Sequence, residues 1–198
     1  MKRIIALVLA MLLALAACEA LAAGKSVALD RKNFPDASFR QFMKTNYDLN
    51  SDGKLSAAEI KKVDSIELTA CNVGSLTGIQ HFPNLIWVTA GGNHIKRVDV
   101  SSNNRLRKLV LGKNRLTKVT LGAQRYMHYL DVSIDNPELK KLDIGQCPKL
   151  LKIFRTGKKT ARRNYVLWKV GGNVNANFLK IPQTCSLYSG KVLLYKGK

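Results

Sequence analysis

The sequence predicts an α+β fold, in which a helix–loop–helix segment caps a short leucine-rich-repeat solenoid and a β-rich segment closes its far end. Three observations carry this prediction: a loop of alternating oxygen-bearing residues, a leucine pattern that recurs every 21–23 residues, and alternating apolar residues near the C-terminus. The expected divisions are a signal peptide at 1–23, the helical cap at 24–62, the repeats at 63–154 and a C-terminal cap at 155–198.

The first 23 residues are expected to direct export. Two cations precede an apolar run from Ile4 to Ala17, which is too short for an ordinary membrane span. Two endings remain open. The sequence "LAAC" resembles a lipobox, which would make Cys18 the lipidated first residue, whereas the small residues up to Ala23 suit ordinary cleavage. Both endings predict an exported chain, either secreted or held at the cell surface by lipid.

The segment "DLNSDGKLSAAE" matches the calcium loop of an EF-hand at every constrained position. The start signals Pro35 and Asp36 and the helical spacing of Phe39, Phe42 and Met43 predict a helix before the loop. The helix-start pair Ser56 and Glu59 predicts a second helix after it. Ca²⁺ takes roughly six to eight oxygens, which side chains, one backbone carbonyl and a bidentate glutamate would supply here. The expected ligands are Asp48, Asn50, Asp52, Lys54 through its carbonyl, Ser56 and Glu59.

This loop is predicted to clamp the scaffold rather than to sense calcium. It is solitary, and Lys54 adds a positive charge to it. We therefore expect one Ca²⁺ site of weak affinity, on the order of 10⁻⁴–10⁻³ M. Gly53 permits the sharp turn, and Leu55 is expected to pack between the helices. The alternative is a loop that has this shape and binds no metal.

From Val63 onward the apolar residues follow the pattern L-x-x-L-x-L-x-x-N-x-L of a leucine-rich repeat. A single coil cannot bury its own leucines, so stacked coils share one continuous core. The asparagine position satisfies backbone groups that would otherwise be buried without a partner. Cys71, Asn93 and Asn114 fill this position, and we expect Cys71 to be a buried structural thiol.

Beyond Leu150 the repeat pattern fails, and two segments alternate like strands. A solenoid needs a cover for its last coil, which is the role expected of 155–198. Cys147 and Cys185 are predicted to join this cap to the last repeat by a disulfide, with free thiols as the alternative.

In each coil the outward-facing residues of the first strand are expected to line up across the sheet as a ladder. This ladder includes the aromatic residues Trp87 and Tyr129, which suit binding of a sugar or a protein partner. The alternative is that these rings only cover the edge of the solenoid. A second ladder, Arg97, Lys118 and Lys141, is expected to be solvated decoration. The residues predicted to form the ligand-binding face are Trp87, Lys108, Tyr129 and Lys152.

The sequence "RTGKKTARR" is a third candidate surface, which suits a polyanion or is simply a basic loop. No aromatic residues are interleaved within it, so specific nucleic-acid binding is not expected. Eleven Lys or Arg and no Asp or Glu follow Leu150, and the formal net charge of the chain is +20. The basic patch consists of Arg155, Lys158, Lys159, Arg162 and Arg163.

Catalysis is not expected. His81, His94 and His128 fall at different repeat positions without metal-ligand spacing, and the sequence carries no nucleophile or phosphate-loop motif. The sequence therefore predicts an interaction module. The alternative function is a basic effector that binds a polyanion, such as a cell-wall polymer, lipopolysaccharide, glycosaminoglycan or nucleic acid, through its C-terminal region.

From Lys32 to Leu150 the chain resembles exported leucine-rich-repeat proteins of gut and oral bacteria that carry an EF-hand-like calcium module at the N-terminus. The resemblance lies in "NFPDASFRQFMKTNYDLNSDGKLSAAEI" followed by repeats such as "LIWVTAGGNHIKRVDVSSNNR". It implies binding or adhesion at the cell surface or outside the cell, with no particular ligand. This chain departs from the family in its small number of repeats and its strong positive charge.

Overall fold

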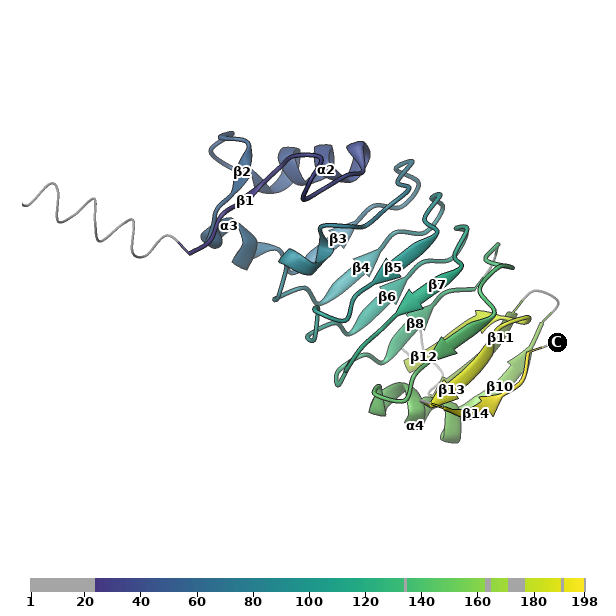
Figure 1. The fold of residues 1–198 in the computed structure, drawn as a ribbon. Coiled ribbons are helices and arrows are strands. Elements are labelled where there is room, and N and C mark those ends of the chain that lie inside the picture. Colours follow the sequence, from purple (N-terminus) through teal and green to yellow (C-terminus); the bar gives the residue numbers. More distant parts are fainter. Residues whose placement is uncertain (1–23, 134, 163–164, 171–176, 190, 198) are drawn as a thin grey trace, which may run out of the picture.

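The computed structural model describes residues 24–133, 135–162, 165–170, 177–189 and 191–197. A small helical cap stands at one end of a β-solenoid, and a helix with two outlying groups of strands closes the other end (Figure 1). Residues 1–23, with Cys18, and also Arg163 lie outside the described residues. Among the described residues, no helix is long and apolar enough to cross a membrane.

The N-terminal cap contains two helices and a two-stranded antiparallel sheet. Asp36 caps the first helix by accepting a hydrogen bond from the Phe39 N–H, and Ser56 and Glu59 form a capping box on the second helix, both as expected from the sequence. Phe39, Met43 and Leu55 are buried between these elements. The elements are β1 (Val27–Ala28), α2 (Ala37–Tyr47), β2 (Lys54–Leu55) and α3 (Ala57–Lys62).

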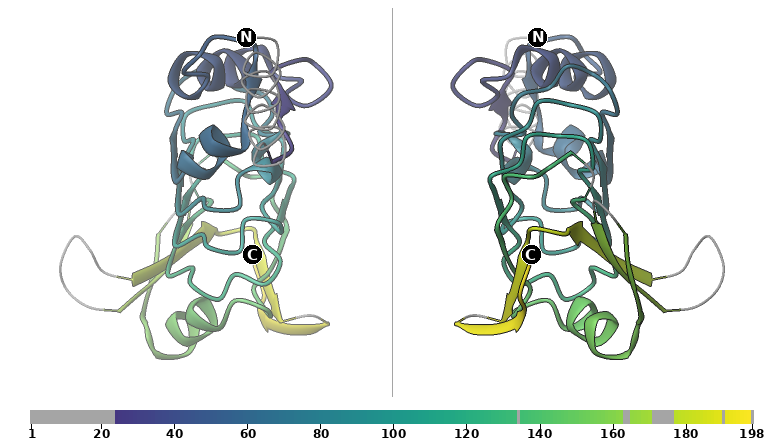
Figure 2. Two further views of the ribbon diagram at one scale, coloured as in Figure 1. Left: turned by 90° about the vertical axis from the view of Figure 1, so that its left-hand side faces the viewer. Right: turned by 90° about the vertical axis from the view of Figure 1, so that its right-hand side faces the viewer.

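The coils of the solenoid contribute short strands to two opposite faces, which enclose the leucine core (Figure 2). The first face carries parallel strands whose central residues, such as Val88, Leu109 and Leu130, are fully buried. Because side chains alternate along a strand, the residues on either side point outward. The strands of this face are β3 (Ser65–Glu67), β4 (Trp87–Thr89), β6 (Lys108–Val110) and β8 (Tyr129–Asp131).

The opposite face carries the second strand of the coils that begin with β4, β6 and β8. Here β5 (Arg97–Asp99) pairs with β7 (Lys118–Thr120), whereas β9 (Lys141–Asp143) belongs to a separate sheet. A short 3-10 helix, η1 (Ile79–His81), lies in the first coil. The two faces therefore differ: the first is one continuous sheet and the second is divided.

The far end is closed by α4 (Pro148–Thr156) and by strands that extend both faces. One group joins the first sheet, because β12 pairs in parallel with β8. The other joins the second face, because β13 pairs in parallel with β9. These strands are β10 (Lys158–Ala161), β11 (Tyr165–Val170), β12 (Asn177–Pro182), β13 (Ser186–Ser189) and β14 (Val192–Tyr195).

The end of the repeat array differs from the sequence-based expectation. Lys152 was expected on the ligand-binding face with Trp87, Lys108 and Tyr129, but it lies in α4. The place beside β8 is taken by β12, with Phe178 opposite Tyr129 and Lys180 opposite Asp131 in the register. Pro148 at the start of a segment with helical apolar spacing favours a helix over another coil.

Candidate functional site

The loop from Asp48 to Glu59 is tightly hydrogen-bonded to itself. The two carboxylate oxygens of Asp48 accept hydrogen bonds from the backbone N–H groups of Asp52 and Gly53, at 3.1 and 3.0 Å. Asp52 Oδ1 accepts from the Lys54 N–H at 2.8 Å. Gly53 has a positive φ of 77°, so the turn uses the conformational freedom of glycine. The loop thus directs the carboxylates of Asp48 and Asp52 toward its own backbone.

Glu59 links the two ends of this loop. Its Oε1 accepts a hydrogen bond from the Leu49 N–H at 2.7 Å, and its Oε2 accepts from both the N–H and the hydroxyl of Ser56 at 2.8 Å. Burial acts to raise the pKa of Glu59, but these hydrogen bonds outweigh it, so the pKa lies below its ordinary value. Glu59 is therefore held as a buried anion.

Acidic side chains in the loop are close in sequence but are not gathered into a cluster. Within the described ranges, no group of three or more His, Cys, Asp or Glu side chains is arranged to hold a metal ion. Glu59 is engaged in its capping box, and Asp52 is turned toward Lys54 N–H and the Asn50 amide. The predicted calcium ligands therefore share one loop, without three of their acidic groups meeting at a point.

Strand β1 supports the loop from outside, a feature that the sequence analysis did not anticipate. Val27 and Ala28 pair antiparallel with Leu55 and Lys54, and the Leu29 N–H donates to the Gly53 carbonyl at 2.9 Å. A two-residue strand is too short to show hydrophobic periodicity, so the local sequence does not predict it. This pairing fixes the part of the loop that leads into α3.

The cap is fastened to the first coil by two polar contacts. Asp36 Oδ2 accepts from the Gly74 and Ser75 N–H groups at 2.8 and 3.2 Å, while its other oxygen caps α2. Tyr47, at the end of α2, donates its hydroxyl to the Ser65 carbonyl at 2.6 Å. The cap and the first strand of the solenoid are thereby joined next to the Asp48–Glu59 loop.

Asparagines in the coils satisfy buried backbone groups, as the repeat pattern predicts. Asn114 Oδ1 accepts from the Ile95 N–H in the preceding coil, and its Nδ2 donates to the Ala90 and Leu111 carbonyls. Asn93 makes equivalent contacts one coil earlier. Asn136 does so one coil later, although the sequence analysis did not assign it to this position because two residues are inserted there.

Cys71 is a correction to the predicted asparagine position. It is exposed instead of buried, and its thiol donates to the Thr69 carbonyl at 3.4 Å. The coil asparagines reach back to the coil before them, and Cys71 lies in the first coil, which has no such neighbour. Its backbone N–H is instead satisfied by Asn93 Oδ1 at 3.1 Å.

The first face presents an aromatic and cationic ladder across neighbouring strands. Trp87 on β4 is 56% exposed, and the register places it between Ser65 and Lys108. Lys108 Nζ lies 5.0 Å from the centre of the Tyr129 ring, which is a cation–π distance. Tyr129 is half-buried, and burial raises its pKa, with a smaller contribution from Asp131. Of the four residues predicted for this face, the structure places three together.

Lys152, the fourth predicted residue, lies on α4 beside a different hollow that His128 and Val170 also line. The structure adds Lys180 to the first face in its place. Its Nζ forms an ion pair with Asp131 at 3.4 Å, in the outer row next to Tyr129. Lys180 lies 49 residues after Asp131, in a segment without the repeat pattern, so sequence periodicity could not find it.

The predicted basic patch is divided between elements. Arg155 is exposed near the end of α4, and Lys158 and Lys159 lie next to each other on β10, where successive side chains point to opposite faces. Lys159 Nζ lies 4.7 Å from the Tyr195 ring centre and 5.9 Å from that of Trp168. Lys158 and Lys159 therefore point to opposite sides of β10, and Arg162, directly after this strand, is exposed.

The disulfide expected between Cys147 and Cys185 is absent, because the structure has both residues as buried free thiols. Cys147 Sγ donates to the Gly122 carbonyl and Cys185 Sγ to the Ser186 carbonyl, each at 3.7 Å. Burial raises the pKa of Cys147 to about 11 and that of Cys185 to about 12. The two sulfurs fill the core as apolar groups.

Solved structures similar to this chain are leucine-rich-repeat solenoids of Listeria monocytogenes. The functional domain of InlJ, which includes a cysteine ladder, superposes with a TM-score of 0.54 at 25% identity, over 64% of this chain and 28% of that one. The internalin InlF aligns at 19% identity with a TM-score of 0.43, over 60% of this chain and 38% of that one. No family model and no curated protein matches the sequence.

The likeness to InlJ supports a bacterial solenoid of the leucine-rich-repeat type, of the kind found in internalins. The chain spans less than a third of the InlJ structure that it matches. The fold is therefore shared over about two thirds of this chain.

Proposed function

We propose that the chain is an exported interaction module, in which the first face of the solenoid binds a protein or a glycan. The observation that carries this proposal is the exposure of Trp87 on a continuous sheet, on the strand next to its edge strand β3. A large apolar ring left 56% exposed between polar neighbours is a typical anchor for a partner. The similarity to the functional domain of InlJ supports the use of the coils for interaction.

The neighbours of Trp87 favour a ligand with both a flat apolar side and polar groups. Lys108 lies next to it in the register and is held over the Tyr129 ring. Stacking on Trp87 and hydrogen bonding to Lys108 suit a sugar ring, and also an aromatic or acidic residue of a protein. The ladder offers no nucleophile with an adjacent base, so the proposed role is binding.

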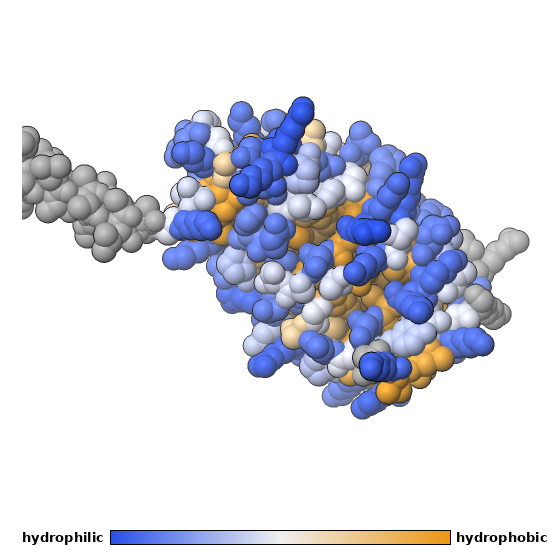
Figure 3. Space-filling model, viewed as in Figure 1, coloured by the Kyte–Doolittle hydropathy of each residue, from blue (hydrophilic) through white to orange (hydrophobic). Residues whose placement is uncertain are grey.

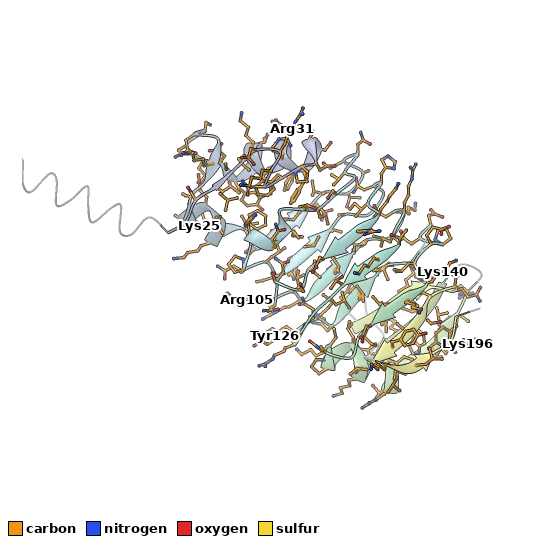
Figure 4. All side chains as sticks on the ribbon, in the orientation of Figure 1. Lys25, Arg31, Arg105, Tyr126, Lys140 and Lys196 are labelled. Atoms are coloured by element: carbon orange, nitrogen blue, oxygen red, sulfur yellow. The ribbon has the colours of Figure 1, made fainter. Side chains whose placement is uncertain are left out.

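A ligand array with a matched pair of variants tests this proposal. Binding of the wild-type chain to arrayed glycans and bacterial or host proteins is compared with that of Trp87→Ala and Tyr126→Ala. Tyr126 is also exposed, but it lies away from the first face, along the same edge of the solenoid as Arg105 (Figure 4). We expect Trp87→Ala to lose the signal and Tyr126→Ala to keep it. Equal binding by all three proteins would overturn the proposal.

We also propose that the Asp48–Glu59 loop binds one Ca²⁺ ion and that this ion has a structural role. Asp48 and Glu59 are both buried anions in a single loop, and a cation would compensate their charge. The oxygens of Asp48 each accept one loop N–H and retain a second acceptor site for an ion. The expected ligands Asn50, Asp52, the Lys54 carbonyl and Ser56 lie in the same loop.

Export is supported by the charged and apolar pattern of the first 23 residues. Mass spectrometry of the mature N-terminus distinguishes the two endings, since a lipid on Cys18 adds a large and defined mass. A chain that begins near Ala23 without lipid would show free secretion, and an intact Met1 would contradict export.

A further inference from the structure

The second face of the solenoid contains a hollow where its sheet is interrupted. The first face pairs without a break from β3 to β12, whereas β7 and β9 on the second face belong to different sheets. Arg97 and Lys118 are 21 residues apart, but Lys118 and Lys141 are 23 apart, so the intervening coil is longer. Between β7 and β9 lies a hollow of about 500 Å³.

Lysines from three separate segments surround this hollow. Lys118 comes from β7, Lys141 from β9, and Lys191 from the residue before β14. All three are exposed, and within the part of the chain that the structure describes none of them forms an ion pair. Lys141 Nζ lies 5.9 Å from the centre of the Tyr188 ring, which also lines the hollow.

Asp143 is the one carboxylate among the residues that line this hollow, against three lysines. Asp143 Oδ1 accepts a hydrogen bond from the Gly145 N–H at 2.7 Å, within its own turn. Val119 at the floor is only 8% exposed, and Tyr188 and the lysine side chains supply much of the wall. The space-filling view shows apolar surface between the polar side chains of the solenoid (Figure 3). The hollow is therefore cationic and shallow, with one aromatic ring at its side.

We propose that this hollow binds an acidic polysaccharide, whose sulfate or carboxylate groups contact Lys118, Lys141 and Lys191 while a sugar ring lies against Tyr188. A polysaccharide carries anions at regular intervals, which suits ammonium groups on neighbouring strands. Lysines on three sides of the hollow favour a ligand with several anions over a peptide that is held by one apolar anchor. A single ring disfavours single-stranded nucleic acid, which uses successive stacking platforms.

The probe for the experiment is dextran sulfate, with unsulfated dextran of the same length as the neutral control. We expect the wild-type chain to bind dextran sulfate in a salt-dependent way and to ignore dextran. Lys118→Gln/Lys141→Gln is expected to weaken binding by about tenfold and to flatten its dependence on salt. Circular dichroism should show an unchanged fold, since both side chains are exposed.

A matched variant separates this site from the overall charge of the chain. Arg155→Gln/Lys158→Gln removes the same two charges from the predicted basic patch and is expected to change affinity by less than about twofold. An equal loss in both double variants would overturn the proposal, because net charge alone would then explain binding. Failure of the wild-type chain to bind dextran sulfate would overturn it as well.

Two further binding measurements distinguish this inference from the proposed function. Trp87→Ala should bind dextran sulfate as the wild type does, because Trp87 lies on the opposite face. A loss in this variant would place the anion site on the first face and overturn the inference. Tighter binding to a single-stranded oligonucleotide of equal charge than to dextran sulfate would identify nucleic acid as the partner and also contradict it.

Discussion

The hydroxyl of Tyr47 donates a hydrogen bond to the backbone carbonyl of Ser65 at 2.6 Å. Tyr47 is the last residue of α2 and immediately precedes Asp48, whereas Ser65 opens the first strand of the solenoid. The proposed calcium loop is therefore one residue away from a contact with the sheet that carries Trp87. Ordering the loop also orders the position of the first strand relative to the cap.

Replacing Tyr47 with phenylalanine should loosen this joint. The variant leaves the Ser65 carbonyl without its partner, and we expect the free energy of unfolding to fall by about 1 kcal/mol. Urea denaturation followed by circular dichroism measures the change. Tyr126→Phe is the matched control, because Tyr126 is exposed and should lose almost nothing. Equal stability of Tyr47→Phe and wild type would show that the hydrogen bond from Tyr47 to the Ser65 carbonyl does not stabilise the fold.

Calcium should stabilise the wild-type chain but not Glu59→Gln. At 10 mM Ca²⁺ and a dissociation constant of 10⁻⁴–10⁻³ M, mass action adds about 1.4–2.7 kcal/mol to the free energy of unfolding. Glutamine retains the capping box but loses the bidentate anion. Thermal unfolding with and without Ca²⁺ measures the effect, and Glu138→Gln, on an exposed turn, is the control. A calcium-insensitive wild type would contradict the metal site.

The pH dependence of stability without calcium should also depend on Glu59. Its folded-state pKa is lowered, so its ionised form stabilises the fold above the unfolded-state pKa of about 4.3. This contribution is lost as the pH falls from there through the folded-state pKa. We expect Glu59→Gln to show a shallower loss of stability on acidification than the wild type. Denaturant titrations between pH 5 and about pH 3 test this, and parallel curves would contradict it.

Asn114→Ala should be strongly destabilising. The substitution leaves the buried Ile95 N–H without its partner, at about 1–3 kcal/mol, and removes one of the two hydrogen bonds that each of the Ala90 and Leu111 carbonyls accepts, at about 0.5–1.5 kcal/mol each. We expect a total loss of at least about 2 kcal/mol in urea denaturation. Asn104→Ala removes the same side chain from an exposed turn and should change stability by less than about 0.5 kcal/mol.

Thiol labelling should distinguish Cys71 from the other cysteines of the described residues. Cys71 is exposed, whereas burial raises the pKa values of Cys147 and Cys185 to about 11 and about 12. With iodoacetamide at pH 8 we expect Cys71 alone to react in the folded protein and all three to react after denaturation. Cys71→Ser should abolish the reaction of the folded protein. Rapid labelling of Cys185 would contradict its burial.

Periodic features were predictable from the sequence. Each coil repeats its apolar residues in phase, so the sheet positions of Trp87, Lys108 and Tyr129 followed from counting. The helix starts at Asp36 and Ser56 were also predicted, because their capping hydrogen bonds are made within three residues. Local hydrogen bonding and regular spacing leave a direct trace in the sequence.

Features made by distant segments were not predictable in this way. Lys180 reaches Asp131 through a strand outside the repeat, and β1 supports the loop with only two residues. The error at Lys152 has a related cause, since one stretch of apolar residues fits either a coil or a helix until Pro148 is weighed. The exposure of Cys71 depends on its coil being first, which the repeat pattern does not encode.

From the coil that begins with β4 to the coil that begins with β6, the number of residues between paired positions is the same on both faces. Trp87 aligns with Lys108, and Arg97 aligns with Lys118, each across 21 residues. A duplicated 21-residue unit at this point would add one strand to each face and leave both capped ends unchanged. In the neighbouring coils at least one face has a longer step, because Ser65 and Trp87 are 22 residues apart and Lys118 and Lys141 are 23 apart, so an insertion there would shift one face against the other. The molecule can thus be lengthened at this coil, by evolution or by design, and each added unit would widen the row that contains Trp87.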